Sequence, residues 1–103
     1  MINKYMYMEI IFYTKSQYCR TTTPNLNNER YRPHLVVKGQ NEYLGVEFIE
    51  GENVVLGESI LAVAECIYEG VNYESLQPNV SFVIMEGANK VGEGKIIERL
   101  NKL

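Results

Sequence analysis

Six short runs of β-branched and aromatic residues, separated by turn-forming residues, are the feature that most constrains how this chain can fold. Val, Ile, Thr, Tyr and Phe together supply 34 of the 103 residues, against only three Ala. Such side chains suit a pleated, half-buried surface. Turn signals such as Gly39-Gln40-Asn41 and Gly51-Glu52-Asn53 separate successive runs. The pattern predicts a mostly β protein and excludes a helical bundle.

The runs predict strands over residues 5–13, 34–38, 43–49, 80–85 and 90–98. The sixth run, residues 59–68, is ambiguous, because periodicity alone would also fit a buried helix. Counted as a strand, it completes a set of six without an internal repeat. Closing six strands into a barrel removes the exposed edges that a flat sheet would leave. We therefore expect one all-β domain, a six-stranded closed barrel over residues 1–103.

Residues 14–30 interrupt this pattern with Ser, Gln, three consecutive Thr, Pro24 and three Asn. We expect a long polar loop here, and a loop longer than most connections in compact domains is either functional or mobile. Pro33 then favours an extended conformation for Arg32 and opens the strand that starts at His34.

Location and thiol state follow from what the sequence lacks. No run reaches the roughly 18 apolar residues of a membrane-spanning helix, and Met1–Tyr13 lacks the charged head and cleavage site of a signal peptide. A cytoplasmic location without a membrane partner is the default expectation. Cys19 and Cys66 have no second cysteine pair, so we expect two free thiols rather than a disulfide framework or a metal site.

The glycine-rich run from Glu86 to Lys95 invites comparison with a nucleotide-binding loop but lacks its pattern. Such a loop needs Gly-Lys-Ser or Gly-Lys-Thr at its end, whereas Glu93 follows Gly92 here. The run fits a hairpin turn followed by glycines that allow close approach in a curved strand. We expect no nucleotide and no other cofactor.

Candidate catalytic groups are sparse. His34 is the only histidine, and no neighbouring carboxylate or cysteine marks it as an acid–base residue. The chain has 13 Glu and no Asp, the glutamates are scattered, and no nucleophile motif or metal-ligand spacing occurs. The sequence therefore predicts a protein that has no catalytic or metal-ligating residues and is not an enzyme.

Charge is distributed unevenly along the chain. Residues 1–38 carry a formal charge of +4 and residues 39–103 carry −7, which leaves −3 overall. The basic part contains Arg30-Tyr31-Arg32-Pro33-His34, in which two guanidiniums could contact phosphates while the tyrosine stacks on a base. The structural alternative is that Tyr31 packs on the barrel and the arginines either snorkel, with their charged ends in water, or pair with glutamates.

Four short motifs stand in residues 20–34, 55–58, 82–87 and 91–94. They resemble the C-terminal β-barrel domain, the third domain, of elongation factor Tu. Arg20-Thr-Thr-Thr-Pro24 followed by Tyr31-Arg32-Pro33-His34 is similar to that domain's Arg-His-Thr-Pro and Tyr-Arg-Pro-Gln stretch. Val55-Leu56-Gly57-Glu58 resembles its Met-Pro-Gly-Asp turn. Residues 82–87 with 91–94 resemble its Phe-Ala-Ile-Arg-Glu-Gly and Val-Gly-Ala-Gly hairpin. The matches keep the family's order over about residues 7–100.

The resemblance implies a closed, antiparallel-type barrel of six strands in which residues 59–68 form a strand. In that family the barrel helps to bind the acceptor and T-stem backbone of aminoacyl-tRNA. Arg32, His34, Glu86 and Gly87 fall on the motifs of that tRNA side. The family's GTPase and middle domains have no counterpart in this sequence, so we do not expect a GTP-driven elongation factor.

Residue types and the resemblance together select the candidate binding residues. The family's two Phe after Pro24 are Asn25-Leu26 here, which suggests a face that no longer packs on a neighbouring domain. The candidates come from the end of the polar loop, the start of the following strand and the later hairpin turn. They are Arg20, Arg30, Tyr31, Arg32, His34, Glu86 and Gly87.

The leading functional hypothesis is a non-catalytic binding module in a translation-related role. A protein partner is favoured over tRNA or another RNA, because the net charge of −3 disfavours extensive phosphate contact. The alternative is a cytoplasmic decoy or immunity-type protein that captures a toxin or regulator by imitating the elongation-factor barrel. No motif specifies the partner's identity or the oligomeric state.

Overall fold

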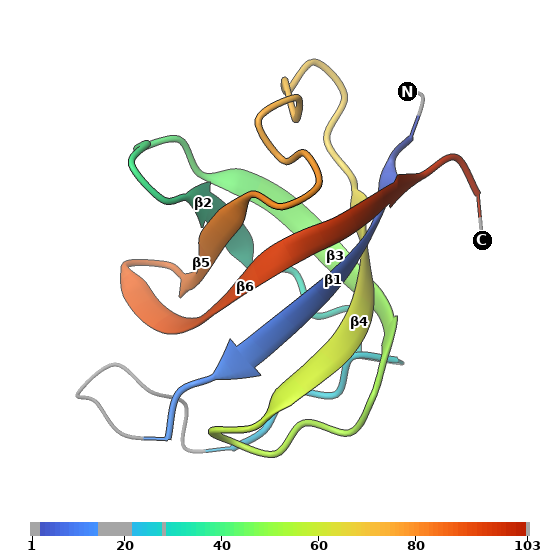
Figure 1. The fold of residues 1–103 in the computed structure, drawn as a ribbon. Coiled ribbons are helices and arrows are strands. Elements are labelled where there is room, and N and C mark those ends of the chain that lie inside the picture. The colour runs from blue at the N-terminus through green and yellow to red at the C-terminus, as the bar shows by residue number, and fades with distance from the viewer. Residues whose placement is uncertain (1–2, 15–21, 28, 103) are drawn as a thin grey trace.

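The computed structural model describes residues 3–14, 22–27 and 29–102, which form six strands (Figure 1). The strands are β1 (Tyr5–Phe12), β2 (His34–Val37), β3 (Leu44–Gly51), β4 (Ser59–Cys66), β5 (Ser81–Glu86) and β6 (Asn89–Leu100). They match the six predicted runs one to one, with ends shifted by at most two residues. The run that periodicity left ambiguous forms β4. Among the described residues, no helix is long and apolar enough to cross a membrane.

Every neighbouring pair of strands is antiparallel, in the order β1-β4-β3-β2-β5-β6 around the sheet. The pairing of β1 with β6 closes the barrel, and Figure 1 shows these two strands side by side along most of their length. The prediction of an all-β, six-stranded, closed antiparallel barrel is therefore confirmed.

Alternating side chains fill the interior of the barrel. From Met6 to Phe12, every second residue of β1 is buried, and β4 buries every second residue from Ile60 to Cys66. Apart from the Tyr73 hydroxyl and the Cys66 thiol, the buried side chains of the described residues are apolar. The interior formed by the described residues therefore offers few polar groups to orient a ligand.

Loop side chains close the two ends of the barrel. Leu26 is buried at the end of β3, where it packs over Gly51. Tyr73 and Leu76, from the segment between β4 and β5, are buried at the opposite end, and Tyr73 lies against the start of β3. Both plugs extend the core beyond the strands and fix the loops that carry them.

The predicted polar loop over residues 14–30 falls partly outside the described residues. Residues 15–21, which include Cys19 and Arg20, and residue 28 lie outside them. The described part of the loop forms no strand, as expected, but it supplies the buried Leu26 to the core. At least this part of the loop is therefore anchored by apolar packing.

Cys66, at the end of β4, is a free and buried thiol. Burial raises its pKa to about 11, although the nearby Arg99 guanidinium acts in the opposite direction. Because the thiolate is the reactive form, Cys66 is unreactive at neutral pH.

Two glycines let β6 approach β1 closely at the seam that closes the barrel. A Cβ on Gly94 would lie 2.6 Å from the carbonyl oxygen of Glu9 and 2.7 Å from the Phe82 ring. A Cβ on Gly92 would lie 2.5 Å from the carbonyl oxygen of Ile11. These separations are shorter than van der Waals contact, so only glycine fits at either position. The sequence-based interpretation of close approach in this strand is confirmed.

We predict that Gly94→Ala destabilises the barrel by about 1–3 kcal/mol, the usual cost of overpacking, because a carbonyl group and the Phe82 ring would have to move. Urea unfolding measures the change. Gly45→Ala is the comparison variant, since its Cβ would meet side-chain atoms of the half-exposed Tyr68 rather than a backbone carbonyl. A loss of stability no larger for Gly94→Ala than for Gly45→Ala would contradict the proposed packing at the seam.

Candidate binding surface

Predicted site residues from two distant parts of the chain meet near the start of β2. The Tyr31 hydroxyl donates a hydrogen bond of 2.5 Å to Oε2 of Glu86, the last residue of β5. His34 is the register partner of Met85, one position before Glu86. Gly87, with a φ of 60°, follows in the turn to β6. The structure thus brings these candidates together, whereas Arg20 lies outside the described residues.

Tyr31 is part of the packing of the barrel. Its ring stacks on Phe48 at a centroid distance of 5.7 Å and tilts against Phe12 at 6.1 Å. Its carbonyl accepts a hydrogen bond of 2.9 Å from the Phe48 N–H, which extends the pairing of β3 beyond β2. Tyr31 therefore takes the position that the structural alternative predicts, and its ring is not an open stacking face.

Arg32 belongs to a row of paired charges on the outside of the barrel. Its guanidinium lies 3.3 Å from the Glu47 carboxylate. Glu47 is the register partner of Glu65, and Lys4 lies 3.1 Å from Glu65. A hydrogen bond and charge attraction from Glu65 raise the pKa of Lys4. We call Lys4, Arg32, Glu47 and Glu65 the ionic row. Arg30 is exposed and has no carboxylate partner among the described residues.

Three aromatic side chains lie beside the ionic row, and we call His34, Tyr43 and Tyr68 the aromatic platform. The His34 and Tyr43 rings are 5.7 Å apart and inclined at 57°. Tyr68 covers Gly45 so closely that a Cβ on Gly45 would overlap the Tyr68 ring and lie 3.6 Å from Cδ2 of His34. Tyr43 and Tyr68 are 47% and 48% exposed. The platform therefore offers large aromatic surface to solvent.

A buried tyrosine holds Tyr68 in place. The Tyr73 side chain is 3% exposed, and its hydroxyl donates a hydrogen bond of 2.6 Å to the carbonyl of Gly45. The same hydroxyl accepts a hydrogen bond of 3.3 Å from the Tyr68 N–H. Burial raises the pKa of Tyr73, so it stays a protonated donor at neutral pH. The Tyr73 side chain thus joins Gly45, against which Tyr68 lies, to the backbone of Tyr68 just after β4.

Arg99 fixes the loop that contains Tyr73. Its guanidinium donates hydrogen bonds of 3.2 Å to the Tyr73 carbonyl and 3.0 Å to the Leu76 carbonyl. Two further bonds, of 2.9 Å and 2.7 Å, go to the Asn3 carbonyl. Three backbone segments are therefore joined by a single charged side chain, and hydrogen bonds to charged groups are among the stronger ones.

A groove of about 400 Å³ runs between the ionic row and the segment that follows β4. Besides the ionic row, its lining includes Tyr68 and Glu69. Carboxylates outnumber cations by three to two in this groove. Glu69 has no ion-pair partner within the described part of the chain. The groove therefore favours a positively charged ligand over an anionic one.

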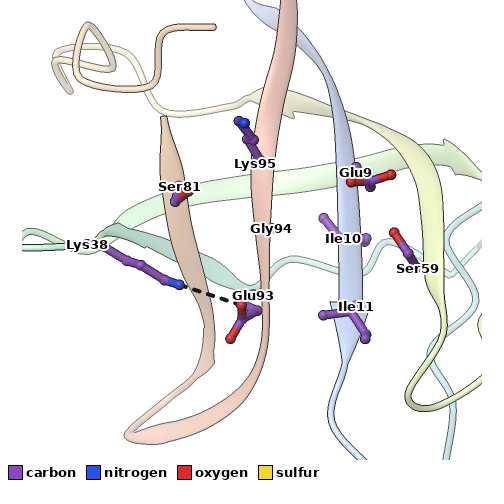
Figure 2. Close-up of a pocket in the computed structure, with 9 residues that line it drawn as sticks. All are labelled: Glu9, Ile10, Ile11, Lys38, Ser59, Ser81, Glu93, Gly94 and Lys95. Carbon is purple, nitrogen blue, oxygen red and sulfur yellow. Dashed lines mark ion pairs between the residues drawn. The ribbon is translucent and has the colours of Figure 1, made fainter. Parts of the chain in front are cut away.

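A second, smaller groove of about 210 Å³ lies on the outer faces of β1, β5 and β6 (Figure 2). Figure 2 shows Lys38 reaching over β5 toward Glu93, at a distance of 3.5 Å. The Tyr13 hydroxyl donates a hydrogen bond of 2.8 Å to the same carboxylate. Glu9 and Lys95 are register partners in this groove. Side chains of opposite charge face one another across the strands of this groove. These charges therefore stabilise contacts between strands and leave little for a charged ligand to bind.

Neither groove contains a recognisable catalytic arrangement. Among the described residues, no group of three or more His, Cys, Asp or Glu side chains could hold a metal ion. The nearest ring to His34 is that of Tyr43, and no hydrogen bond from the imidazole to a carboxylate occurs in the described part of the chain. The surface offers aromatic rings and paired charges, which are interactions typical of binding interfaces.

Sequence reasoning missed four residues that build this surface: Tyr43, Tyr68, Tyr73 and Arg99. One signal was present, because Gly45 stands inside a strand, and a glycine there often marks the close approach of another group. That signal does not identify what approaches. The partner of Gly45 lies more than twenty residues away in the sequence and is set by the folded register.

Comparison with known proteins adds no relative, since no protein-family model and no curated protein matches this chain significantly. The resemblance to the third domain of elongation factor Tu rests on its short motifs and remains a prediction. The function has to be argued from the surface residues themselves.

We predict that Tyr13→Phe reduces the loss of stability at alkaline pH. Burial and the hydrogen bond to Glu93 raise the pKa of Tyr13 above its ordinary value. Its stabilisation is therefore complete below about pH 10, where an unfolded tyrosine ionises, and is lost as the pH rises further. Thermal unfolding across this range measures the effect. Tyr43→Phe is the control. If Tyr13→Phe loses as much stability at alkaline pH as the parent chain does, Tyr13 is not the group responsible.

Proposed function

We propose that this chain is a non-catalytic binding module that recognises a protein partner through the aromatic platform and the adjacent groove. The observation that carries the proposal is a pair of half-exposed tyrosines on a barrel with a filled interior. Tyr43 lies against His34, and Tyr68 lies against Gly45, close to the same histidine. Tyrosine is enriched among the residues that dominate binding energy at protein interfaces.

Clustering distinguishes the platform from ordinary exposed apolar residues. Four large hydrophobic side chains are exposed among the described residues, and two of them belong to the platform. The other two, Val55 and Ile97, lie in the β3–β4 connection and on β6, so they do not form a patch with it. Isolated apolar residues on a surface need no function, whereas a rigid aromatic cluster beside a charged groove favours one.

Charge favours a protein partner over RNA. RNA affinity depends on lysine and arginine side chains that neutralise phosphates. Arg32 is already paired with Glu47, and Glu65 and Glu69 add negative charge to the same surface. These carboxylates would repel the phosphates of RNA, whereas they would attract a cationic side chain of a protein segment.

The resemblance to the elongation-factor barrel supports a partner from the translation machinery. The decoy hypothesis, in which the barrel captures a toxin or regulator, uses the same surface but a different partner. The identity of a captured protein separates these two roles, because only one of them involves a translation component.

We predict that Tyr43→Ser and Tyr68→Ser each weaken capture of the partner by about tenfold or more, since both remove aromatic contact area. The measurement is affinity capture from the native cell, followed by titration with the purified captured protein. Val55→Ser is the matched control, because Val55 is also 47% exposed but lies away from the platform. Capture that falls only with Val55→Ser, or with none of the variants, would refute the proposed surface.

We also predict that the parent chain shows no salt-dependent binding of tRNA, and that Arg30→Ala with Arg32→Ala leaves this result unchanged. Loss of the Arg32–Glu47 pair should cost less than about 1 kcal/mol, because the pair is partly exposed. Fluorescence titration with labelled tRNA at two salt concentrations makes the test. Binding that weakens with salt and disappears in the double variant would favour the RNA hypothesis instead.

A further inference from the structure

We infer that the partner presents an arginine side chain to this surface, with its guanidinium stacked on the Tyr68 ring and paired with the Glu69 carboxylate. This inference rests on the proposed protein-binding function and adds the chemistry of the recognised group. A half-exposed aromatic ring, an unpaired carboxylate and an anchored backbone support it independently.

The Tyr68 ring is accessible to a ligand. Its Cδ2–Cε2 edge lies against Gly45, while about half of the residue remains exposed. The face of an aromatic ring attracts a cation that comes within about 6 Å of the ring centroid. Guanidinium is planar and less strongly hydrated than the ammonium of lysine, so it stacks on such a face more readily. The inclined His34 and Tyr43 rings form the other part of the aromatic platform.

The charge of the groove supplies the second part of the recognition. Each cation of the ionic row already lies within 3.3 Å of a carboxylate of the same row. Glu69 directly follows Tyr68, lines the same groove and has no ion-pair partner in the described ranges. An arriving guanidinium would therefore find a free carboxylate next to the ring on which it stacks. A phosphate or carboxylate ligand would find none of its required donors unpaired in the ionic row.

The scaffold holds the ring before a partner arrives. Tyr73 bonds to both the Tyr68 N–H and the Gly45 carbonyl, so the backbone on either side of the contact is fixed. Arg99 in turn fixes the Tyr73 backbone. A site that is ordered in advance loses less conformational entropy on binding. This allows a single side chain of the partner to contribute measurably to affinity.

The test is an NMR titration of the full chain, labelled with nitrogen-15, with Nα-acetyl-arginine amide. The matched ligand is Nα-acetyl-citrulline amide, which has nearly the same shape without the positive charge. We expect saturable shifts of the Gly45, Tyr68 and Glu69 amide signals with the arginine compound at millimolar concentrations. The citrulline compound should bind at least about fivefold more weakly.

Two variants separate the aromatic and the ionic contributions. Tyr68→Leu keeps apolar area but removes the ring face, and Glu69→Gln removes the negative charge with little change of shape. Each should weaken binding of the arginine compound by about three- to tenfold. Val55→Leu is the control variant and should bind like the parent. Dispersed amide signals verify that each variant is folded, and Glu69→Gln, at an exposed position, tests the inference even if Tyr68→Leu does not fold.

Equal binding of the two compounds, shifts confined to other surfaces, or the absence of saturable shifts would each overturn the arginine inference. Different results would contradict the proposed function. If Tyr43→Ser and Tyr68→Ser abolish capture of the protein partner while arginine and citrulline compounds bind equally, only the arginine inference is wrong. If an RNA oligonucleotide shifts the same amide signals and competes with the partner, both proposals are wrong.

Discussion

The close approach of β6 to β1 is the constraint on which the rest of this structure depends. Gly92 and Gly94 allow the two strands to pair where any side chain would strike the backbone of β1. That pairing closes the barrel, and closure leaves no strand edge for further pairing. It also encloses an interior that is almost entirely apolar among the described residues. The proposed recognition therefore uses the outer face and the loops that close the ends.

At one end, the same contacts stabilise the fold and hold the proposed binding surface. The Tyr73 ring closes the core, while its hydroxyl joins the Gly45 carbonyl to the Tyr68 N–H. A buried polar group left without a partner costs about 1–3 kcal/mol, so these bonds strongly favour one arrangement of the loop. Arg99 adds four bonds to backbone carbonyls of the same region. The exposed ring of Tyr68 is therefore the outer end of a rigid, buried network.

The fold was predictable because its signals are local. Alternation and turn residues located all six runs, although periodicity alone left residues 59–68 open between strand and helix, and glycines in the last strand indicated close approach. The binding surface was less predictable, because its contacts join distant residues: Tyr31 reaches Glu86, and Tyr68 covers Gly45. The basic Arg30–His34 stretch looked suited to phosphates, yet the folded register places Glu47 beside Arg32. Residue types indicated which part of the chain forms the candidate surface. The pairing of strands decides which charged side chains lie next to one another on it.

Site-specific photocrosslinking tests the central claim most directly, because it reports what touches the platform in the intact cell. A photoreactive phenylalanine analogue would replace Tyr43, which is exposed and makes its ring contact with His34 at the edge of the platform. The same analogue at Val55 samples the opposite end of the barrel. The account predicts a discrete protein adduct from position 43 and none from position 55. An adduct with RNA at position 43, or a protein adduct at position 55 alone, would contradict it.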